Sequence, residues 1–204
     1  MHSSIYLASR SPRRRELLKQ LGVKFDPLLL RLNGPRGADV DEEQHPGESA
    51  ADYVERTARE KAAFGLRVLG MRSMVTRPVL AADTVVVVGG DVLGKPANRA
   101  EAEAFMQRMS GRTHEVRTTV ALAMEGPVMS STSVSTVTFR AITDDEARRY
   151  CATSEPYDKA GGYGIQGLAA LFIERIEGSY TGVMGLPLFE TGRLLMQVLS
   201  LIHI

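Results

Sequence analysis

The sequence predicts an α/β fold, with a mixed central sheet and flanking helices arranged in two lobes. A run rich in β-branched residues, from Val79 to Lys95, is interrupted by Gly89 and Gly90, as in a β-hairpin. Alternating polar and apolar residues over 113–124 and 130–141 indicate two further strands. Capped helical segments lie between these strands, and such a mixture of hairpins and crossovers is typical of a mixed sheet.

The first elements are expected directly at the amino terminus. Residues 5–9 favour a short buried strand, and residues 12–21 favour a helix that Ser11 caps and Gly22 ends. The first turn of that helix contains three arginines, at positions 13–15. The helix dipole prefers acidic side chains there, so an anion close to this turn would resolve the conflict.

The middle of the chain alternates loops and helices. Glycine, proline and charged residues from Leu30 to Ser49 predict a loop, and a helix is expected from Ala50 to Leu69. Asn98, followed three residues later by Glu101, predicts the start of another helix, which Gly111 ends.

The last third contains two helix signals and one glycine-rich turn. Thr143 and Glu146 predict a capping box at the start of a helix. The glycine-rich segment 154–167 predicts a long turn that leads into a strand over 171–178. A final helix is expected from Pro187 to Leu201.

Composition narrows the class of protein. The chain has 204 residues, of which 44% are hydrophobic, so it can bury a sizeable core. Twenty-five basic and 24 acidic residues leave a net charge of +1, which argues against a protein that coats nucleic acid. A single cysteine, Cys151, excludes an internal disulfide, and the four scattered histidines make a zinc site improbable.

Targeting and membrane signals are not found in the sequence. The amino terminus reaches its arginines too early for a signal peptide, and no segment approaches the length of a membrane span. A cytoplasmic protein that binds neither membrane nor nucleic acid is therefore expected.

Three residues are candidates for chemistry, each with an alternative structural role. Asp83 lies inside a hydrophobic strand run, where it either bonds nearby backbone or holds a metal ion or activates water. Lys95 follows the return strand of the same hairpin and is either a solvated turn residue or a cation that lies near the level of Asp83 or a little beyond it. Lys61 lies beside the apolar stripe of its helix, as a flanking lysine or as a site cation.

Two charged segments also leave two interpretations open. The acidic run Asp41–Glu43 is either a solvated loop or a carboxylate source for a divalent cation. The arginine turn is either a set of surface arginines or a phosphate cradle, to which Ser9 and Ser11 would add hydroxyl donors. Together these groups suit a polyphosphate and a metal, whereas no nucleophile dyad is evident. Phosphoryl or nucleotidyl chemistry through metal-activated water fits best.

The chain resembles a known family along nearly its whole length. The motifs that carry the resemblance, in order, are LASRSPRR, EKA at 60–62, AADTVV at 81–86, GKP at 94–96, SGRTHEV at 110–116, EPYDKAGGYGIQG and GSYTGVMGLPL. They are similar to those of the Maf family, which are cytoplasmic nucleoside triphosphate pyrophosphatases also named for an association with septum formation. The resemblance implies a single Maf-like domain over residues 1–204, with a Maf/inosine-triphosphatase-like α/β architecture and a cleft between two lobes.

The resemblance also implies roles for particular residues. Asp83 corresponds to the family's catalytic acid, which accepts a proton from water or anchors the metal, and Glu42 to its second acidic residue. The phosphate-binding set that the resemblance implies is Ser9, Arg13, Arg14, Lys61 and Lys95. Arg13, Thr84 and Gln166 fall where the family sets substrate preference.

The function expected from the resemblance is hydrolysis of dTTP or UTP, or of modified pyrimidine triphosphates, to the monophosphate and pyrophosphate. The expected cofactor is Mg²⁺ or Mn²⁺, held by Asp83 and Glu42, and a homodimer is expected from the family. DKAGGYGIQG is similar to the dTTP/UTP branch. The alternatives are the 7-methyl-GTP branch and a non-enzymatic, nucleotide-binding regulator of septum formation.

Overall fold

The fold is mixed α/β, as the sequence predicts. The computed structural model describes residues 2–31 and 38–199. Its sheet has the strand order β2-β1-β3-β5-β6-β7, and β4 pairs with β3 outside this path. No helix in the described ranges is long and apolar enough to cross a membrane.

The chain divides into two compact units. The first unit comprises Met1–Asp83, Thr118–Thr132 and Gly185–Ile204, and the second comprises Thr84–Arg117 and Ser133–Met184. Strands β3 (Val79–Val88), β5 (Thr113–Ala123) and β6 (Met129–Phe139) each supply residues to both units. The division of β3 falls directly after Asp83.

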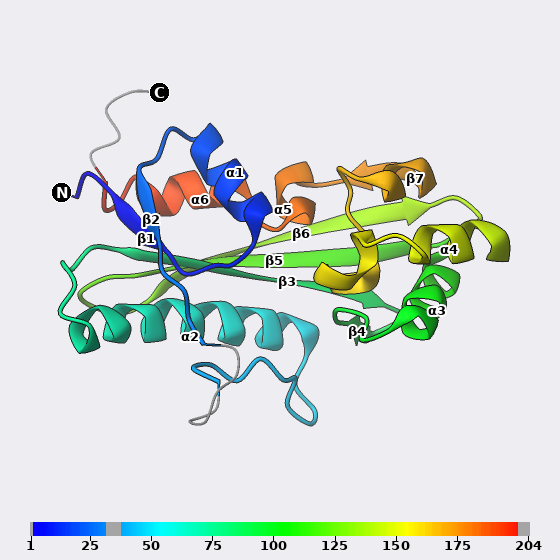
Figure 1. Cartoon of the computed structure of the whole chain (residues 1–204). Coiled ribbons are helices and arrows are strands. Elements are labelled where there is room, and N and C mark those ends of the chain that lie inside the picture. The colour runs from blue at the N-terminus through cyan, green and yellow to red at the C-terminus, as the bar shows by residue number, and fades with distance from the viewer. Residues whose placement is uncertain (1, 32–37, 200–204) are drawn as a thin grey trace. The chain divides into compact units, whose positions relative to one another are not determined.

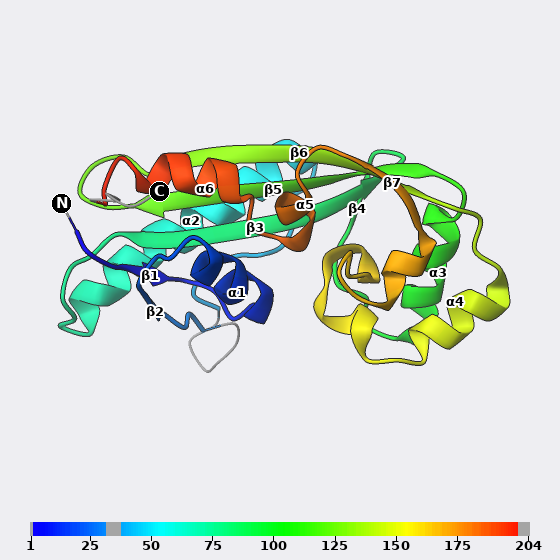
Figure 2. The same ribbon diagram turned by 90° about the horizontal axis from the view of Figure 1, so that it is seen from above.

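The first unit is a three-layer α/β/α arrangement. Its short strands β1 (Ile5–Leu7) and β2 (Phe25–Pro27) pair in parallel, and β1 also pairs in parallel with β3. Helix α2 (Ala50–Met71) covers one face of these strands, while α1 (Pro12–Gln20) and α6 (Leu188–Leu195) cover the other (Figures 1 and 2).

Helix α2 approaches strand β3 closely because it carries a glycine at the contact. A Cβ atom on Gly65 would lie 2.7 Å from Val79 Cγ1, which is too close for any larger residue without a shift. Apolar side chains from α2, β1 and β3 fill the rest of this core, including Ala58, Ala62 and Val79. The contact brings the preceding turn of α2, which contains Lys61, beside the carboxyl-terminal end of this part of β3.

The second unit is built from a hairpin, helices and an antiparallel strand pair. Strand β3 turns through Gly89 and Gly90, with φ of 61° and 93°, and returns antiparallel, as the sequence predicts. Strand β6 pairs antiparallel with the last strand of this unit. The other α-helices and strands of the unit are β4 (Asp91–Leu93), α3 (Arg99–Met109), α4 (Asp144–Cys151), β7 (Ile173–Glu177) and α5 (Tyr180–Met184). Three 3₁₀ helices, Glu155–Asp158, Ala160–Gly162 and Leu168–Phe172, also belong to it.

The predicted caps are confirmed. The side chains of Ser11, Asn98 and Thr143 each accept a hydrogen bond from the backbone N–H three residues later. Glu146 completes the capping box by accepting from the backbone N–H of Thr143 at 2.9 Å. The helix starts could be predicted from the sequence because each cap depends only on residues within one helical turn.

The final helix is shorter than predicted. Helix α6 ends at Leu195 rather than at Leu201, and residue 201 lies outside the described range. The carbonyl of Val198 accepts a hydrogen bond from the backbone N–H of His2, and His2 forms a bridge with Leu199. Pairing with the amino-terminal segment therefore takes the place of a further helical turn, although the apolar pattern continues.

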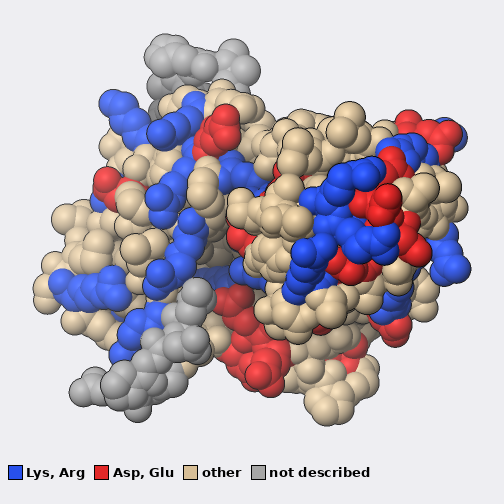
Figure 3. Space-filling model, turned by 45° about the vertical axis from the view of Figure 1, so that its right-hand side comes forward, with Lys and Arg blue, Asp and Glu red and all other residues tan. Residues whose placement is uncertain are grey.

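Both signs of charge occur on the surface. Figure 3 shows Lys and Arg side chains together with Asp and Glu side chains on the face in view, as the balanced totals lead us to expect. An anion site on this protein must therefore be local rather than a product of net charge.

Candidate active site

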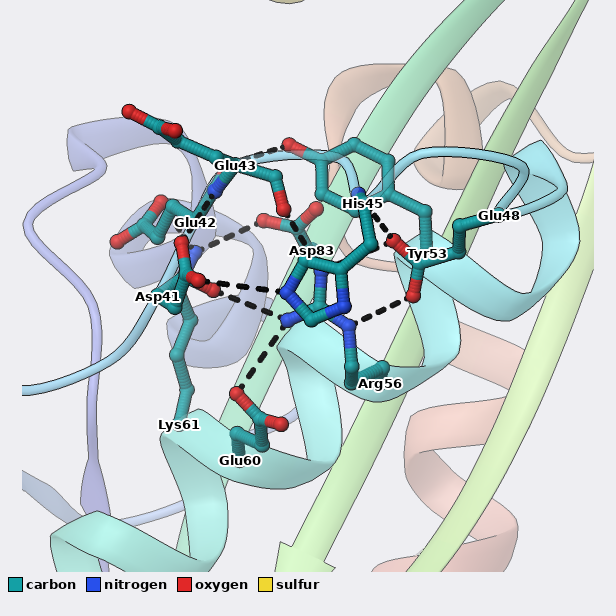
Figure 4. A network of polar contacts seen from close by, with 10 residues as sticks. All are labelled: Asp41, Glu42, Glu43, His45, Glu48, Tyr53, Arg56, Glu60, Lys61 and Asp83. Atoms are coloured by element: carbon teal, nitrogen blue, oxygen red, sulfur yellow. Dashed lines mark hydrogen bonds and ion pairs between the residues drawn. The ribbon is translucent and has the colours of Figure 1, made fainter.

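A lysine joins two carboxylates at the centre of the candidate site. Lys61 Nζ lies 2.7 Å from Glu42 Oε2 and 2.8 Å from Asp83 Oδ1 (Figure 4). The three residues come from a loop, from α2 and from β3, and all belong to the first unit. The fold thus brings Lys61 into contact with residues that are 19 and 22 positions away in the sequence.

The site is shielded from water on one side. The side chains of Lys61 and Asp83 are 12% and 14% exposed, whereas that of Glu42 is 40% exposed. Charge interactions strengthen as water is excluded, and a shielded charge needs a counter-charge. Lys61 neutralises Asp83 at the shielded end, and Glu42 lies at the open end.

Lys61 contacts one of the two carboxylate oxygens of Asp83. Its Nζ donates a hydrogen bond to Oδ1 at 2.8 Å. The carboxylate is therefore oriented through one oxygen while the other can accept a proton from water or bind a cation.

The first turn of α1 lies close to this carboxylate. Arg14 Nη1 donates to the carbonyl of Ala82 at 2.6 Å, and Arg14 Nε donates to the carbonyl of Gly185 at 2.7 Å. Burial lowers the pKa of Arg14, against the charges of Asp83 and Glu42, which raise it. The acidic groups thus supply part of the negative charge that the sequence demands beside the arginine turn.

Ser9 shapes the entry to this helix. It is buried, and its Oγ accepts a hydrogen bond from the backbone N–H of Ser11 at 3.1 Å. Ser11 in turn accepts from the backbone N–H of Arg14 at 3.4 Å. The next residue, Arg13, is partly buried and has interactions within the protein. The predicted phosphate-binding roles of Ser9, Arg13 and Arg14 stay predictions.

Three predicted site residues belong to the second unit. Thr84 directly follows Asp83 in β3 and is partly buried. Lys95 is exposed just after β4, and Gln166 is exposed in a turn. Their roles toward a substrate stay predictions.

A carboxylate that the sequence analysis overlooked fixes the segment that carries Gln166. Glu155 accepts hydrogen bonds from the backbone N–H groups of Leu168, at 2.7 Å, and Ala169, at 3.1 Å. It also accepts from the hydroxyl of Tyr150 at 3.0 Å. The residue forms part of the EPYD motif, but nothing in the local pattern reveals that its partners lie 13 and 14 residues further on.

A second group of overlooked residues surrounds Glu42. Tyr53 donates its hydroxyl hydrogen bond to the carbonyl of Glu42 at 2.7 Å, and Arg56 donates to the carbonyls of Asp41 and Glu43. Tyr53 and Arg56 are three residues apart and so share one helix face, but this spacing alone does not reveal that their partners lie in the loop.

The described side chains do not by themselves form a closed metal cage. Among residues 2–31 and 38–199, no cluster of three or more His, Cys, Asp or Glu side chains is arranged to hold a metal ion. The donor set at Lys61 nevertheless suits a hard cation, because two carboxylates already converge on one positively charged atom.

Comparison with known proteins places the chain in a family. Residues 4–198 match the family model described as "Maf: Maf-like protein". A dTTP/UTP pyrophosphatase of Aromatoleum aromaticum is 57% identical over 197 residues, which cover 96% of this chain and 95% of the relative. The corresponding protein of Bordetella parapertussis is 54% identical, covering 94% and 90%, and that of Dechloromonas aromatica is 50% identical, covering 95% and 96%.

A solved structure, that of the Staphylococcus aureus Ham1 protein, has a TM-score of 0.49 and 13% identity, and covers 96% of this chain and 91% of its own. A similarity of this size carries no functional argument. The family model and the relatives span nearly the whole chain, as the sequence motifs do. The chain belongs to the Maf family.

Proposed function

We propose that this protein is a nucleoside triphosphate pyrophosphatase that hydrolyses dTTP and UTP to the monophosphate and pyrophosphate. The observation that carries the proposal is the contact of Lys61 with both Glu42 and Asp83 beside the arginine turn of α1. The names of the relatives, each a dTTP/UTP pyrophosphatase, support the choice of substrate.

Asp83 directs the attacking water in this proposal. Its Oδ1 is held by Lys61, so Oδ2 can accept a proton from water aimed at the α phosphorus of the substrate. Bond formation at that phosphorus breaks the bond to the bridging oxygen, and pyrophosphate leaves with the electron pair.

Positive side chains stabilise the triphosphate. Lys61 lies at the site, and the first turn of α1 adds Ser9, Arg13 and Arg14, which we propose bind phosphate oxygens. We assign Lys95 to the same role. These groups would neutralise charge that develops on the bridging and non-bridging oxygens.

We propose a divalent cation, Mg²⁺ or Mn²⁺, as the cofactor, bound by Asp83 and Glu42. Mg²⁺ commonly uses one or two carboxylates and completes its shell with substrate phosphates and water, so two converging carboxylates suffice. When bound, such an ion supplies charge neutralisation and polarises a phosphate oxygen. Removing it with a chelator is expected to stop turnover, and adding Mg²⁺ back is expected to restore it.

Base selection is assigned to Arg13, Thr84 and Gln166. The amide of Gln166 can donate and accept hydrogen bonds, as the edge of a pyrimidine requires. The predicted cleft between two lobes, the homodimer and the cytoplasmic location stay predictions, and light scattering behind size-exclusion chromatography would test the dimer.

A panel of triphosphates, with release of pyrophosphate as the readout, tests the proposed function. The panel contains dTTP, UTP, dCTP, dATP and 7-methyl-GTP, each with Mg²⁺. We expect the highest kcat/KM for dTTP and UTP. A preference for 7-methyl-GTP would move the chain to the other branch, and binding without turnover of any member would favour a nucleotide-binding regulator.

A further inference from the structure

Arg56 of α2 makes several contacts with residues 41–48, which we call the acidic loop. Its guanidinium binds both carboxylate oxygens of Glu48, with Nε 2.6 Å from Oε1 and Nη2 3.0 Å from Oε2. It also donates to the carbonyl of Asp41 at 3.1 Å and to the carbonyl of Glu43 at 2.8 Å. The contacts to the loop therefore flank Glu42 on both sides (Figure 4).

The pair formed by Arg56 and Glu48 is stronger than an ordinary surface ion pair. The two side chains are 19% and 11% exposed, and the bidentate geometry matches the fork of a guanidinium to a carboxylate. Hydrogen bonds from Arg56 lower the pKa of Glu48 to about 2, and Glu48 raises the pKa of Arg56 in return. Both groups are charged at every pH at which the enzyme would work.

Further hydrogen bonds hold the backbone of the acidic loop, and Glu48 makes one of them. Its Oε2 accepts from the backbone N–H of His45 at 3.0 Å, and Asp41 Oδ1 accepts from the backbone N–H of Glu43 at 2.9 Å. Tyr53 adds a further fixed point, because its hydroxyl donates to the carbonyl of Glu42 at 2.7 Å. Residues 41–43 thus have all three main-chain carbonyls bound by two side chains of α2.

This geometry determines where the Glu42 carboxylate points. Residues 38–48 contain no helix or strand, so the chain itself does not fix the direction of Glu42. Lys61 lies on the same helix, five residues after Arg56, and reaches Glu42 Oε2 at 2.7 Å. One rigid helix thus holds both the backbone around Glu42 and the cation that its carboxylate contacts.

We propose that Arg56 is a positioning residue, which acts with Tyr53 and Glu48 to hold the acidic loop on α2 so that Glu42 faces Lys61 and Asp83. The proposal rests on the proposed function, since it concerns a residue assigned to the metal. In this proposal Arg56 acts through the backbone around Glu42 and through Glu48. A residue that orients a metal ligand in this way commonly affects metal affinity or activity by about 10- to 100-fold.

Arg56→Lys is the main test, because it keeps the positive charge and removes the fork that binds four acceptor atoms of the loop at once. Arg59→Lys is the matched control: Arg59 lies on the same helix and donates to Ser130 at 2.9 Å instead of to the loop. Each variant is assayed for kcat and KM with dTTP, and for the Mg²⁺ concentration that gives half-maximal activity.

We expect Arg56→Lys to raise that Mg²⁺ concentration about 10- to 100-fold and to change kcat at saturating Mg²⁺ much less. Arg59→Lys is expected to resemble the wild type. Glu48→Gln, which removes the counter-charge but keeps the shape, is expected to shift the Mg²⁺ dependence in the same direction as Arg56→Lys.

A readout without substrate or metal separates loop positioning from loss of folding. A glutamate-specific protease can cut the loop after Glu42, Glu43 or Glu48, and mass spectrometry identifies the cut. We expect about tenfold faster cleavage there in Arg56→Lys, since local release exposes the loop, with an unchanged rate in Arg59→Lys. Cleavage throughout the variant, outside the loop as well, would instead indicate unfolding and overturn the proposal.

The inference and the proposed function can fail separately. If the wild type releases pyrophosphate and Arg56→Lys has the same Mg²⁺ dependence and the same cleavage rate, Arg56 does not position Glu42. Faster cleavage with an unchanged Mg²⁺ dependence also overturns the proposal, because the loop then matters only for structure. A wild type that releases no pyrophosphate from any triphosphate overturns the proposed function.

Discussion

The two units use buried and half-buried polar groups in opposite ways. In the first unit, Lys61 and Asp83 form an ion pair in a shielded position, with 2.8 Å between Nζ and Oδ1. In the second unit, His114 is only 3% exposed, and its Nε2 lies 2.8 Å from the hydroxyl of Tyr163. The ring of Phe139 packs edge-on against His114 at 5.0 Å between centroids.

The difference follows from what each group must do. A charged cluster is costly to bury unless counter-charges are present, and it is useful where a phosphate or water must be handled. A neutral imidazole can fill a core, and burial lowers the pKa of His114 to about 4, so the ring is uncharged at neutral pH. Lys61 and Asp83 thus form an ion pair that suits the proposed chemistry, whereas His114 contributes a polar group to packing.

The largest effect is expected from Asp83→Asn. The substitution removes the proton acceptor but leaves the shape of the side chain, so kcat for dTTP is expected to fall about a thousandfold. Lys61 retains Glu42 as a counter-charge, so the free energy of unfolding is expected to change by less than about 1 kcal/mol. Pyrophosphate release and urea unfolding measure the two quantities.

A variant that retains more than a tenth of the wild-type kcat would show that Asp83 belongs to the structural polar groups rather than to the reaction. The ion pair of the first unit would then have a structural role, like the buried polar groups of the second unit.

The second-largest effect is expected at two glycines of the second unit that have similar φ but differ in how tightly they are packed. Gly161 has φ of 67°, and a Cβ there would lie 2.8 Å from Val86 Cγ2, whereas Gly89 has φ of 61° and open space around it. Gly161→Ala is expected to lower the free energy of unfolding by about 3 kcal/mol, from backbone strain and overpacking together. Gly89→Ala, with strain alone, is expected to cost about 1 kcal/mol.

Equal losses in the two variants, measured by urea unfolding at pH 7.5, would mean that the contact of Gly161 with Val86 does not constrain the fold. Glycine would then be required at position 161 only for its positive φ and not for close packing.

A smaller effect is expected from the pH dependence of stability. The folded pKa of His114, about 4, lies below its ordinary value near 6.5, so the unfolded chain binds more protons between these pH values. The contribution is fully present above pH 6.5 and is lost as the pH falls toward 4. Between pH 7.5 and pH 5 the wild type is expected to lose about 2 kcal/mol relative to a chain without this histidine.

His114→Gln is the reference for that measurement, because glutamine can bond the Tyr163 hydroxyl and does not titrate. Urea unfolding of both proteins at the two pH values isolates the histidine from the carboxylates, which titrate in both. Parallel pH profiles would show that folding does not lower the pKa of His114.

Local signals in the sequence predicted much of this fold. Ser11, Asn98 and Thr143 marked three helix starts correctly, and Gly89 and Gly90 marked the hairpin, because each depends on residues within one turn. The short strand β2 was missed because three residues give no periodicity, and its pairing with β1 is decided by tertiary contacts. The end of α6 was wrong for the same reason, since His2 binds the carbonyl of Val198.

The site was predictable in part. Asp83 was found because a carboxylate in a hydrophobic strand conflicts with its surroundings, and Lys61 because it borders an apolar stripe. Neither Arg56 nor Glu155 creates such a conflict locally, and the loop and turn residues that they bind are 8 to 15 residues away. Residues that support a site through long-range hydrogen bonds to backbone leave no periodic mark, so only the folded structure reveals them.

The origin of the oxygen in the products tests the central claim most directly. Hydrolysis of dTTP by the wild type in H₂¹⁸O, followed by mass spectrometry of both products, shows which phosphorus water attacks. If Asp83 directs water at the α phosphorus, the label appears in dTMP and pyrophosphate carries none. Label in pyrophosphate would place the attack at the β phosphorus and would contradict the proposed role of the charged site.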